Sequence, residues 1–240
     1  MKKIKHIFRF LFVFAAIHLF LPGCSDMNDL HETYMKDGER IYIGKIDSLK
    51  VFPGDECVKL RFWASDPRVK SVKFSWVPNN NSMNVPIRKV SPIDSFEVLI
   101  GKKFNTTLIG EENYTFKIVT SDDNGSFSVP FEKVISVYGE NYRSGLSNRV
   151  LKSTSYNDTD KSLTLNFSNP INEEEIGVKI LYNEIGGLQK TLLLTNKEIT
   201  GAIIITGVDT SAVVSYCSQF LPEPLAIDTF SADVKTVKIP

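Results

Sequence analysis

Histidine is nearly missing from this chain, which has three in 240 residues. His6 and His18 fall within the first 23 residues and His31 follows soon after, so residues 32–240 contain none. Ser-His and Cys-His nucleophile pairs need an imidazole held within hydrogen-bond reach by a rigid scaffold. Zinc sites of the His₃, His₂Glu and Cys₂His types need imidazole as well. We therefore expect no catalytic residue, no metal site and no cofactor in the folded part, unless the segment around His31 supplies the group.

Cysteine is also scarce, with Cys24, Cys57 and Cys217 making up the whole set. Cys57 and Cys217 fall in different predicted domains, so a disulfide between them would have to cross from one domain to the other. Free cysteine commonly packs as a small hydrophobic residue. The sequence therefore predicts two buried free thiols.

A long apolar run is absent too. Residues 10–21 carry no charge, but a helix that crosses a membrane needs about 20 apolar residues. Lys2, Lys3, Lys5 and Arg9 precede this short run, and the small residue Gly23 follows it. A basic start, a short apolar core and a small residue before the cut are typical of a secretory signal peptide. We predict such a peptide over residues 1–23.

The residues at the predicted cut, Leu21-Pro22-Gly23-Cys24, resemble the lipobox of bacterial lipoproteins. The resemblance implies that Cys24 is the site of lipid attachment and the first residue of the mature protein; the alternative is an ordinary signal peptide with a chance cysteine. Each buried CH₂ contributes about 0.8 kcal/mol, so two or three acyl chains would hold the protein on a membrane. We expect it lipid-anchored in the outer membrane, on the periplasmic or cell-surface face.

The charge balance turns negative once the predicted leader is removed. Lys plus Arg falls from 28 to 24 while Asp plus Glu stays at 28, so residues 24–240 carry 24 − 28 = −4. No overall basic field remains to attract nucleic acid, which we exclude as a partner. Residues 24–40 are polar and charged, and we read them as a tether.

From residue 41 the pattern changes to short alternating strands. Val58, Leu60 and Phe62 alternate with polar residues, and Val72, Phe74 and Trp76 repeat the pattern. Further strands are expected at 45–52, 96–100, 114–118 and 134–138, with a loop at 78–84 and turns at Pro53-Gly54, Asp66-Pro67 and Asp123-Asn124-Gly125. Short strands at roughly ten-residue spacing predict a β-sandwich over residues 41–138, the fold that immunoglobulin-like domains build from seven strands.

This half resembles a fibronectin type III domain. Leu108 stands six residues before Tyr114, as a leucine does before the corner tyrosine of that fold, and Phe62 stands in the strand that usually carries its tryptophan. Trp76 shares a face with Val72 and Phe74 and is expected in the core. Trp63 has the opposite parity to Phe62, so it could face solvent and stack on a sugar ring.

Residues 138–149 form a polar connector in which Tyr142 is either exposed or packed between domains; it is the second candidate ligand-binding residue. Alternation returns at Leu163, Leu165 and Phe167, and at Val178, Ile180 and Tyr182, with a hairpin turn expected at Gly186-Gly187. Long helices are absent. The sequence predicts an all-β chain of two tandem immunoglobulin-like sandwiches, the second over residues 139–240.

Acidic runs raise two further candidates. Glu111-Glu112 and Glu173-Glu174-Glu175 could supply the carboxylate pair of a glycosidase, but both abut turn-like sequence, where charge is usually solvated. Asp122-Asp123-Asn124-Gly125 begins like an EF-hand calcium loop, yet Phe127 and Lys133 stand where that loop needs glycine and glutamate. Asn-Gly between two strands favours a hairpin turn.

A wider resemblance covers most of the mature chain. It is carried by Gly38-Glu39, Tyr42, Gly44-Lys45, Asp47-Ser48-Leu49, Pro53-Gly54, Val58-Lys59-Leu60, Asp66-Pro67 and Trp76, and at the connector by Tyr138-Gly139, Tyr142, Leu146 and Arg149. In these the chain resembles a family of Bacteroidota lipoproteins known as domain of unknown function 4998. The resemblance implies an accessory role in glycan uptake of the starch-utilisation type, with a glycan or an outer-membrane uptake complex as partner. Asp47-Ser48-Leu49 also resembles an O-glycosylation site of Bacteroides proteins, although a strand accounts for the same residues.

We therefore expect a non-catalytic, membrane-anchored binding or accessory module, with its binding site on loops at one sandwich end. Two alternatives remain open. One is a structural or adhesin spacer subunit that binds protein partners through an exposed edge strand. The other is a carboxylate-dependent glycosidase, which would need a cleft with two facing acids.

Overall fold

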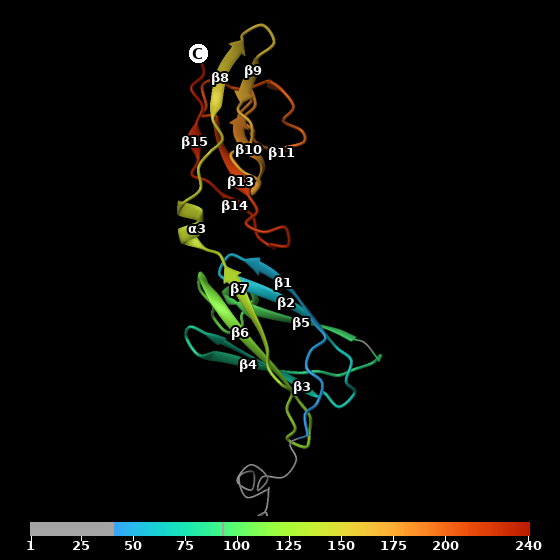
Figure 1. Ribbon diagram of the computed structural model, residues 1–240. Coiled ribbons are helices and arrows are strands. Elements are labelled where there is room, and N and C mark those ends of the chain that lie inside the picture. The colour runs from blue at the N-terminus through green and yellow to red at the C-terminus, as the bar shows by residue number, and fades with distance from the viewer. Residues whose placement is uncertain (1–40, 93) are drawn as a thin grey trace, which may run out of the picture. The chain divides into compact units, whose positions relative to one another are not determined.

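The computed structural model describes residues 41–92 and 94–240 (Figure 1). Residues 42–240 form one compact unit. The predicted signal peptide, the lipid-attachment residue Cys24 and the predicted tether lie outside the described residues. Within the described residues, no helix has the length and apolar character needed to cross a membrane.

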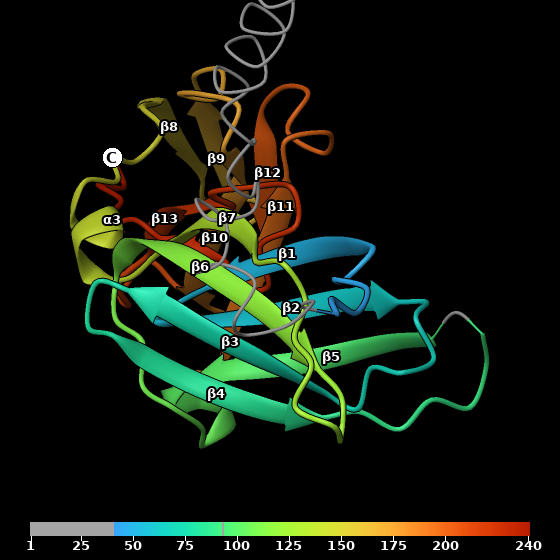
Figure 2. The same cartoon turned by 60° about the horizontal axis from the view of Figure 1, so that its bottom comes forward.

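The first half of the unit is a sandwich of two antiparallel sheets (Figures 1 and 2). One sheet has three strands in the order β1-β2-β5, and the other has four in the order β4-β3-β6-β7. The strands are β1 (Ser48–Gly54), β2 (Cys57–Ala64), β3 (Ser71–Val77), β4 (Asn81–Pro86), β5 (Asp94–Gly101), β6 (Glu112–Ser121) and β7 (Phe131–Val137). The β-sandwich predicted from the alternating pattern is confirmed.

Aromatic side chains fill the space between these two sheets. The ring centroids of Phe62 on β2 and Phe74 on β3 are 5.5 Å apart, which joins the sheets face to face. Trp76 on β3 stacks on Phe116 of β6 with centroids 5.2 Å apart. All four side chains are buried, so the core position predicted for Trp76 is confirmed.

The corner before β6 differs in detail from the prediction. The hydroxyl of Tyr114 donates a hydrogen bond to the carbonyl oxygen of Gly110 at 3.3 Å, as a corner tyrosine does. Leu108, however, is 67% exposed, and its neighbour Ile109 is buried instead, so the assignment of Leu108 to the corner position is wrong. The 3₁₀ turn η1 (Lys102–Phe104) and the left-handed Asn105 (φ 53°) precede this segment, and Ile109 joins the hydrophobic core.

The loop expected at residues 78–84 is also wrong, because most of it is β4. The chain reverses within three residues, where Asn79 and Asn80 take positive φ values of 81° and 49°. Asparagine tolerates this left-handed region better than most residues. Ser82 then lies opposite Ser75 in an antiparallel register, and Met83 packs against the core from this edge strand. Ser82 and Asn84, two of the polar residues in this stretch, are exposed and alternate with Met83 and Val85 along the strand.

A second pair of sheets follows, in the orders β12-β9-β8 and β11-β10-β13, with β14 and β15 both pairing with β13. Its strands are β8 (Leu151–Asn157), β9 (Ser162–Phe167), β10 (Glu175–Asn183), β11 (Gln189–Thr195), β12 (Ile203–Thr206), β13 (Ser215–Phe220), β14 (Phe230–Ser231) and β15 (Lys235–Thr236). Gly186 and Gly187 make the predicted turn between β10 and β11, with φ values of 106° and 87° that favour glycine. Leu163, Val178 and Tyr216 contribute to a separate hydrophobic core. The chain is thus all-β with two sandwiches, as predicted, whereas the boundary between residues 138 and 139 stays a prediction.

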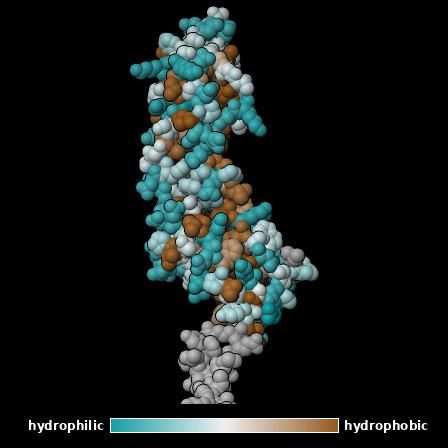
Figure 3. All heavy atoms as spheres, in the orientation of Figure 1, coloured by the Kyte–Doolittle hydropathy of each residue, from teal (hydrophilic) through white to brown (hydrophobic). Residues whose placement is uncertain are grey.

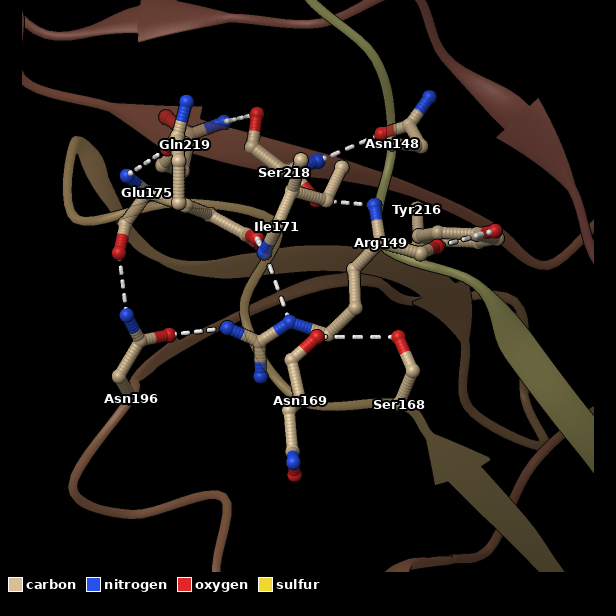
Figure 4. A network of polar contacts seen from close by, with 11 residues as sticks. Asn148, Arg149, Ser168, Asn169, Ile171, Glu175, Asn196, Tyr216, Ser218 and Gln219 are labelled. Carbon is tan, nitrogen blue, oxygen red and sulfur yellow. Dashed lines mark hydrogen bonds and ion pairs between the residues drawn. The ribbon is translucent and has the colours of Figure 1, made fainter.

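A buried ion pair anchors the start of the second sandwich (Figure 4). Arg149 Nε donates to Glu175 Oε1 at 2.9 Å, and both side chains are at most 1% exposed. The other oxygen of Glu175 accepts the N–H of Ile171 at 2.7 Å, and the hydroxyl oxygen of Ser218 accepts the N–H of Arg149 at 2.8 Å. The expectation of a solvated acidic run is therefore wrong for Glu175, because β10 begins there and turns this side chain inward.

Apolar side chains on the surface lie among polar ones. Figure 3 shows them interspersed with hydrophilic residues on the face in view. Two strands at sheet edges of the second sandwich carry exposed aliphatic residues, Leu193 on β11 and Ile204 on β12. Single exposed apolar residues are common on protein surfaces. These two are noteworthy because they lie on edge strands, where another strand could pair.

Candidate functional site

Trp63 lies near the end of β2, on the face of the three-stranded sheet that points away from the core. In the antiparallel register its neighbours are Ser48 on β1 and Ser95 on β5, and both are exposed. Phe62 beside it is fully buried, while Trp63 is partly exposed. The structure therefore places Trp63 on the solvent side of the sheet, where a ligand can reach its ring.

Cations surround the aromatic rings on this side of the sheet. We call it the cationic face, made by Lys50 and Phe52 of β1, Lys59, Arg61 and Trp63 of β2, and Glu97 of β5. Lys59 Nζ is 4.7 Å from the centroid of the Phe52 ring, and Arg61 Cζ is 5.7 Å from the same centroid. Lys50 Nζ lies 5.9 Å from the centroid of Trp63. Distances below about 6 Å allow cation–π attraction, so the rings help to position the three cations.

The charge on the cationic face is positive, although residues 24–240 carry a net negative charge. Arg61 donates from Nε (2.8 Å) and Nη2 (2.5 Å) to one oxygen of Glu97. The hydrogen bond from Arg61 lowers the pKa of the Glu97 carboxyl, which keeps it ionised. Three cations and one carboxylate give the face 3 − 1 = +2, against −4 for residues 24–240. An exposed surface of this kind can hold a ligand.

Tyr142, the second sequence candidate, lies elsewhere. It belongs to the short helix α3 (Glu140–Ser144). The sequence predicted only a polar connector in this region and no helix. Its ring packs edge-on against Phe230 and against Tyr138, each with centroids 5.0 Å apart, and its hydroxyl donates to Glu174 Oε2 at 2.8 Å. The sequence left open whether Tyr142 is exposed or packed between the domains, and the structure places it between the sandwiches.

The two candidate residues lie in different regions. Trp63 is six residues along β2 from Cys57, which lies beside the junction between the sandwiches. About 20 Å of strand therefore separates Trp63 from that junction.

The junction between the sandwiches is held by polar contacts from both halves. Ile227 N–H donates to the carbonyl oxygen of Pro53 at 2.8 Å, and Asp55 N–H donates to Asp228 Oδ2 at 3.0 Å. Arg143 of α3 forms an ion pair with Asp55 at 2.6 Å. The first two contacts join the β1–β2 turn to the segment before β14, and the ion pair joins α3 to the same turn. Sequence reasoning missed them because each one joins residues far apart in the chain.

Glu111 caps the start of α3. One carboxylate oxygen accepts the N–H of Asn141 at 2.6 Å and the other accepts the N–H of Tyr142 at 2.7 Å. The first N–H groups of a helix have no partner within the helix, and a carboxylate at this end satisfies them. The first acidic run thus contributes a helix cap, and this use of Glu111 was not foreseen.

A hollow of about 560 Å³ lies beside the junction, lined by Asp55, Glu56, Lys102, Lys103 and Asp228. Burial tends to raise the pKa of Asp228, but hydrogen bonds from Lys103 and from the Asp55 N–H outweigh it and lower that pKa. Burial and the neighbouring Asp228 raise the pKa of the Cys57 thiol to about 12. At neutral pH Asp228 is therefore ionised and Cys57 protonated, which suits a structural role better than acid or nucleophilic catalysis.

Other sequence candidates resolve in simple ways. Cys57 and Cys217 are buried free thiols, as predicted. Asp122 Oδ1 accepts the N–H groups of Asn124 and Ser126 at 2.9 and 2.8 Å, so the predicted turn is confirmed. In the described part of the chain, no three His, Cys, Asp or Glu side chains are grouped to hold a metal ion. Ser48 begins β1 and is exposed, and its glycosylation stays a prediction.

Comparison with known proteins gives a family and two structural likenesses. Residues 24–230 match the family described as a domain of unknown function, DUF4998. A two-domain fibronectin type III segment of chicken tenascin is 15% identical, with a TM-score of 0.32, over 81% of this chain and 100% of the tenascin segment. The FN1–FN3 domains of chicken CNTN1 are 9% identical, with a TM-score of 0.40, over 82% of this chain and 66% of that one. No curated protein matches. Because the family match spans most of its length, the chain belongs to the family of the domain of unknown function DUF4998.

Proposed function

We propose that this protein is a non-catalytic binding module that holds a glycan on the cationic face of its first sandwich. The observation that carries the proposal is the placement of Trp63 and Phe52 on the outward side of the β1-β2-β5 sheet. Aromatic rings at accessible surfaces are common anchors for ligands, because they offer a large contact area with few rotatable bonds. An open sheet face suits an extended chain that lies across the strands.

The proposed setting is a membrane outside the cytoplasm. The short apolar run and Gly23-Cys24 support a lipid anchor at Cys24, in the outer membrane and on its periplasmic or cell-surface side. The two sandwiches would then present the cationic face to ligands as an accessory part of a glycan-uptake assembly. Loss of palmitate labelling in a Cys24→Ala variant is the expected result for the anchor, and retained labelling contradicts it.

The chemistry of the carboxyl groups favours binding over the glycosidase alternative. A glycosidase needs one carboxylic acid whose pKa is raised, so that it can protonate the leaving group. The shifted carboxyl groups of the described residues include Asp66, Glu97 and Asp228, and hydrogen bonds from basic groups or backbone N–H groups lower the pKa of each. Glu174 and Glu223 accept hydrogen bonds from the hydroxyl groups of Tyr142 and Tyr138, so both carboxylates already have phenol partners.

A glycan array probed with residues 25–240, which include the compact unit 42–240, tests the proposal. For every glycan that binds, we expect Trp63→Ala to weaken binding at least tenfold, because about 1.4 kcal/mol is lost with the ring contact. Lys73→Ala is the matched control, since it removes one exposed side chain from the outer face of the four-stranded sheet. Silence across the array, or binding that Trp63→Ala leaves unchanged, contradicts the proposal.

A structural or adhesin subunit remains the second candidate. It is favoured by the exposed aliphatic residues Leu193 and Ile204, which lie on edge strands able to accept a partner strand. Under this alternative the array stays silent, and cross-linking in intact cells joins the protein to a neighbour. A Leu193→Lys variant would then lose that cross-link, whereas Trp63→Ala would keep it.

A further inference from the structure

We propose that the glycan held by the cationic face is acidic, that is, a polymer with repeated carboxylate or sulfate groups. This inference rests on the proposed function and narrows its ligand class. The sequence suggested a bare tryptophan on which any sugar ring could stack. The structure instead places a cation beside each ring of the face.

The Phe52 ring of the cationic face acts mainly as a support for charge. Lys59 and Arg61 lie over the same Phe52 ring at 4.7 and 5.7 Å, so a neutral sugar would have to displace both before stacking there. An anionic group can bind these cations without displacing them from the ring. Because the ring limits the freedom of the two side chains beforehand, less conformational entropy is lost when an anion binds.

Glu97 leaves the face positive and orders it further. Both of its hydrogen bonds from Arg61 end on Oε1, so the fork of Arg61 is fixed while Lys50 and Lys59 make no ion pair among the described residues. Both lysines can therefore donate hydrogen bonds to an external carboxylate or sulfate. A local charge of +2, against −4 for residues 24–240 together, also concentrates anions at this surface.

The spacing of the cations favours a chain over a single small anion. Lys50 and Arg61 stand directly opposite each other on neighbouring strands. Lys59 is two residues from Arg61 on the same strand, which is a step of about 7 Å. Three positive groups spread over two strands on an open face suit acidic groups that repeat along a polymer, whereas a single phosphate is best held by groups that converge on one point.

A second group of cations in the same sandwich offers a matched control. Lys70 and Arg88 line a hollow of about 390 Å³ between the loops that follow β2 and β4. Lys89 in the same lining donates from Nζ to the carbonyl oxygen of Asp66 at 2.7 Å. Replacing Lys70 and Arg88 changes the net charge by the same amount as replacing Lys50 and Lys59, but leaves the cationic face intact.

The test measures binding of residues 25–240 to polygalacturonate, dextran sulfate and neutral dextran by affinity electrophoresis. We expect retardation by at least one acidic polymer, weakening as salt is added, and none by dextran. The double variant Lys50→Gln/Lys59→Gln is expected to bind at least tenfold more weakly, and Lys70→Gln/Arg88→Gln within twofold of the unchanged protein. Fluorescence of Trp63 gives a second readout, since Trp76, the other tryptophan, is buried.

The outcomes separate this inference from the proposed function. Binding of a neutral glycan that needs Trp63 but not Lys50 and Lys59 overturns the acidic ligand class while the binding role stands. Equal losses in both double variants show a net-charge effect alone and overturn the inference. Failure of both acidic polymers to bind also overturns it, and a silent glycan array in addition removes the proposed function itself.

Discussion

Arg149 and Glu175 form the buried ion pair on which the second sandwich starts. Taking two charges out of water is costly, and the pair persists because other groups satisfy its remaining hydrogen-bonding atoms. Asn196 Oδ1 accepts from the guanidinium, and the N–H of Ile171 donates to the second oxygen of Glu175. Removing one partner leaves the other charge buried and unpaired, which is worse than removing both.

We predict that Arg149→Met lowers the free energy of unfolding by about 3–5 kcal/mol, measured by urea denaturation. The double variant Arg149→Met/Glu175→Leu should recover much of this loss, because no buried charge is left alone. The exposed pair of Arg61 and Glu97 is the control, and Arg61→Met should cost less than about 1 kcal/mol. A double variant less stable than Arg149→Met alone would contradict the account.

At this scale the sequence predicts inward-facing apolar residues well and buried charges poorly. Trp76 and Phe62 could be placed because their neighbours alternate with them at the period of a strand. Glu175 could not, since it ends a run of three glutamates that reads as solvated surface. Its partner Arg149 lies 26 residues away, and no local pattern connects the two.

At the scale of elements, the sequence predicts most strands of the first sandwich but not the helix α3. The strands of the first sandwich follow from alternation and turn residues, except β4, whose polar edge looked like a loop. The helix α3 has five residues and no buried side chain, so it carries no amphipathic signal. Its cap comes from Glu111, 30 residues from Asn141. Elements that owe their stability to distant groups are the ones that the sequence does not reveal.

The tyrosines around α3 make the junction sensitive to alkaline pH. Burial, then the nearby Glu223, raises the pKa of Tyr138 to about 12, and burial and Glu174 raise that of Tyr142 as well. The folded state thus favours the protonated phenols. Their contribution to stability is complete below the ordinary tyrosine pKa of 10.0 and is lost as pH rises through the raised values.

We predict that the free energy of unfolding falls between about pH 10 and 12, and that Tyr138→Phe/Tyr142→Phe falls less steeply. Urea denaturation of both proteins across this range gives the difference between their free energies of unfolding. The contribution of the titrating lysines is common to both proteins, so it cancels in that difference. The absorbance of tyrosinate gives a direct check, because the variant should lose the late-titrating groups. Parallel pH profiles for the two proteins would show that these hydroxyls do not couple to folding.

On the scale of the whole molecule, the two sandwiches pack through a tight contact at Gly54. A Cβ added there would lie 2.5 Å from Asp228 Oδ2, 2.6 Å from Cys57 Sγ and 2.9 Å from Ile227 Cγ1. Real Cβ atoms do not approach other atoms so closely, so a side chain at this position would force the side chains of Asp228, Cys57 and Ile227 to shift. The sequence predicted both sandwiches and a turn at Pro53-Gly54, but not that the turn is a contact surface.

We predict that Gly54→Ala destabilises residues 42–240 by about 1–3 kcal/mol and lowers the thermal midpoint by about 2–10 °C, measured by calorimetry. Small-angle scattering should also show greater motion between the sandwiches. Gly110→Ala is the control, because a Cβ there meets nothing within 4 Å and its φ is not positive. An unchanged midpoint and scattering profile in Gly54→Ala would mean that the contact does not couple the two halves.

The length of chain between the partners of this contact has a kinetic consequence. Asp55 and Asp228 are 173 positions apart, and Arg143 and Asp55 are 88 apart. Contacts between such distant residues reward folding only after the entropy of closing the loop between them has been lost. Each sandwich can collapse on local pairings first, and the interface closes afterwards between two nearly finished surfaces. During synthesis, the first sandwich would therefore fold before Asp228 has left the ribosome. Its contact surface for the second sandwich would stay exposed to solvent until then.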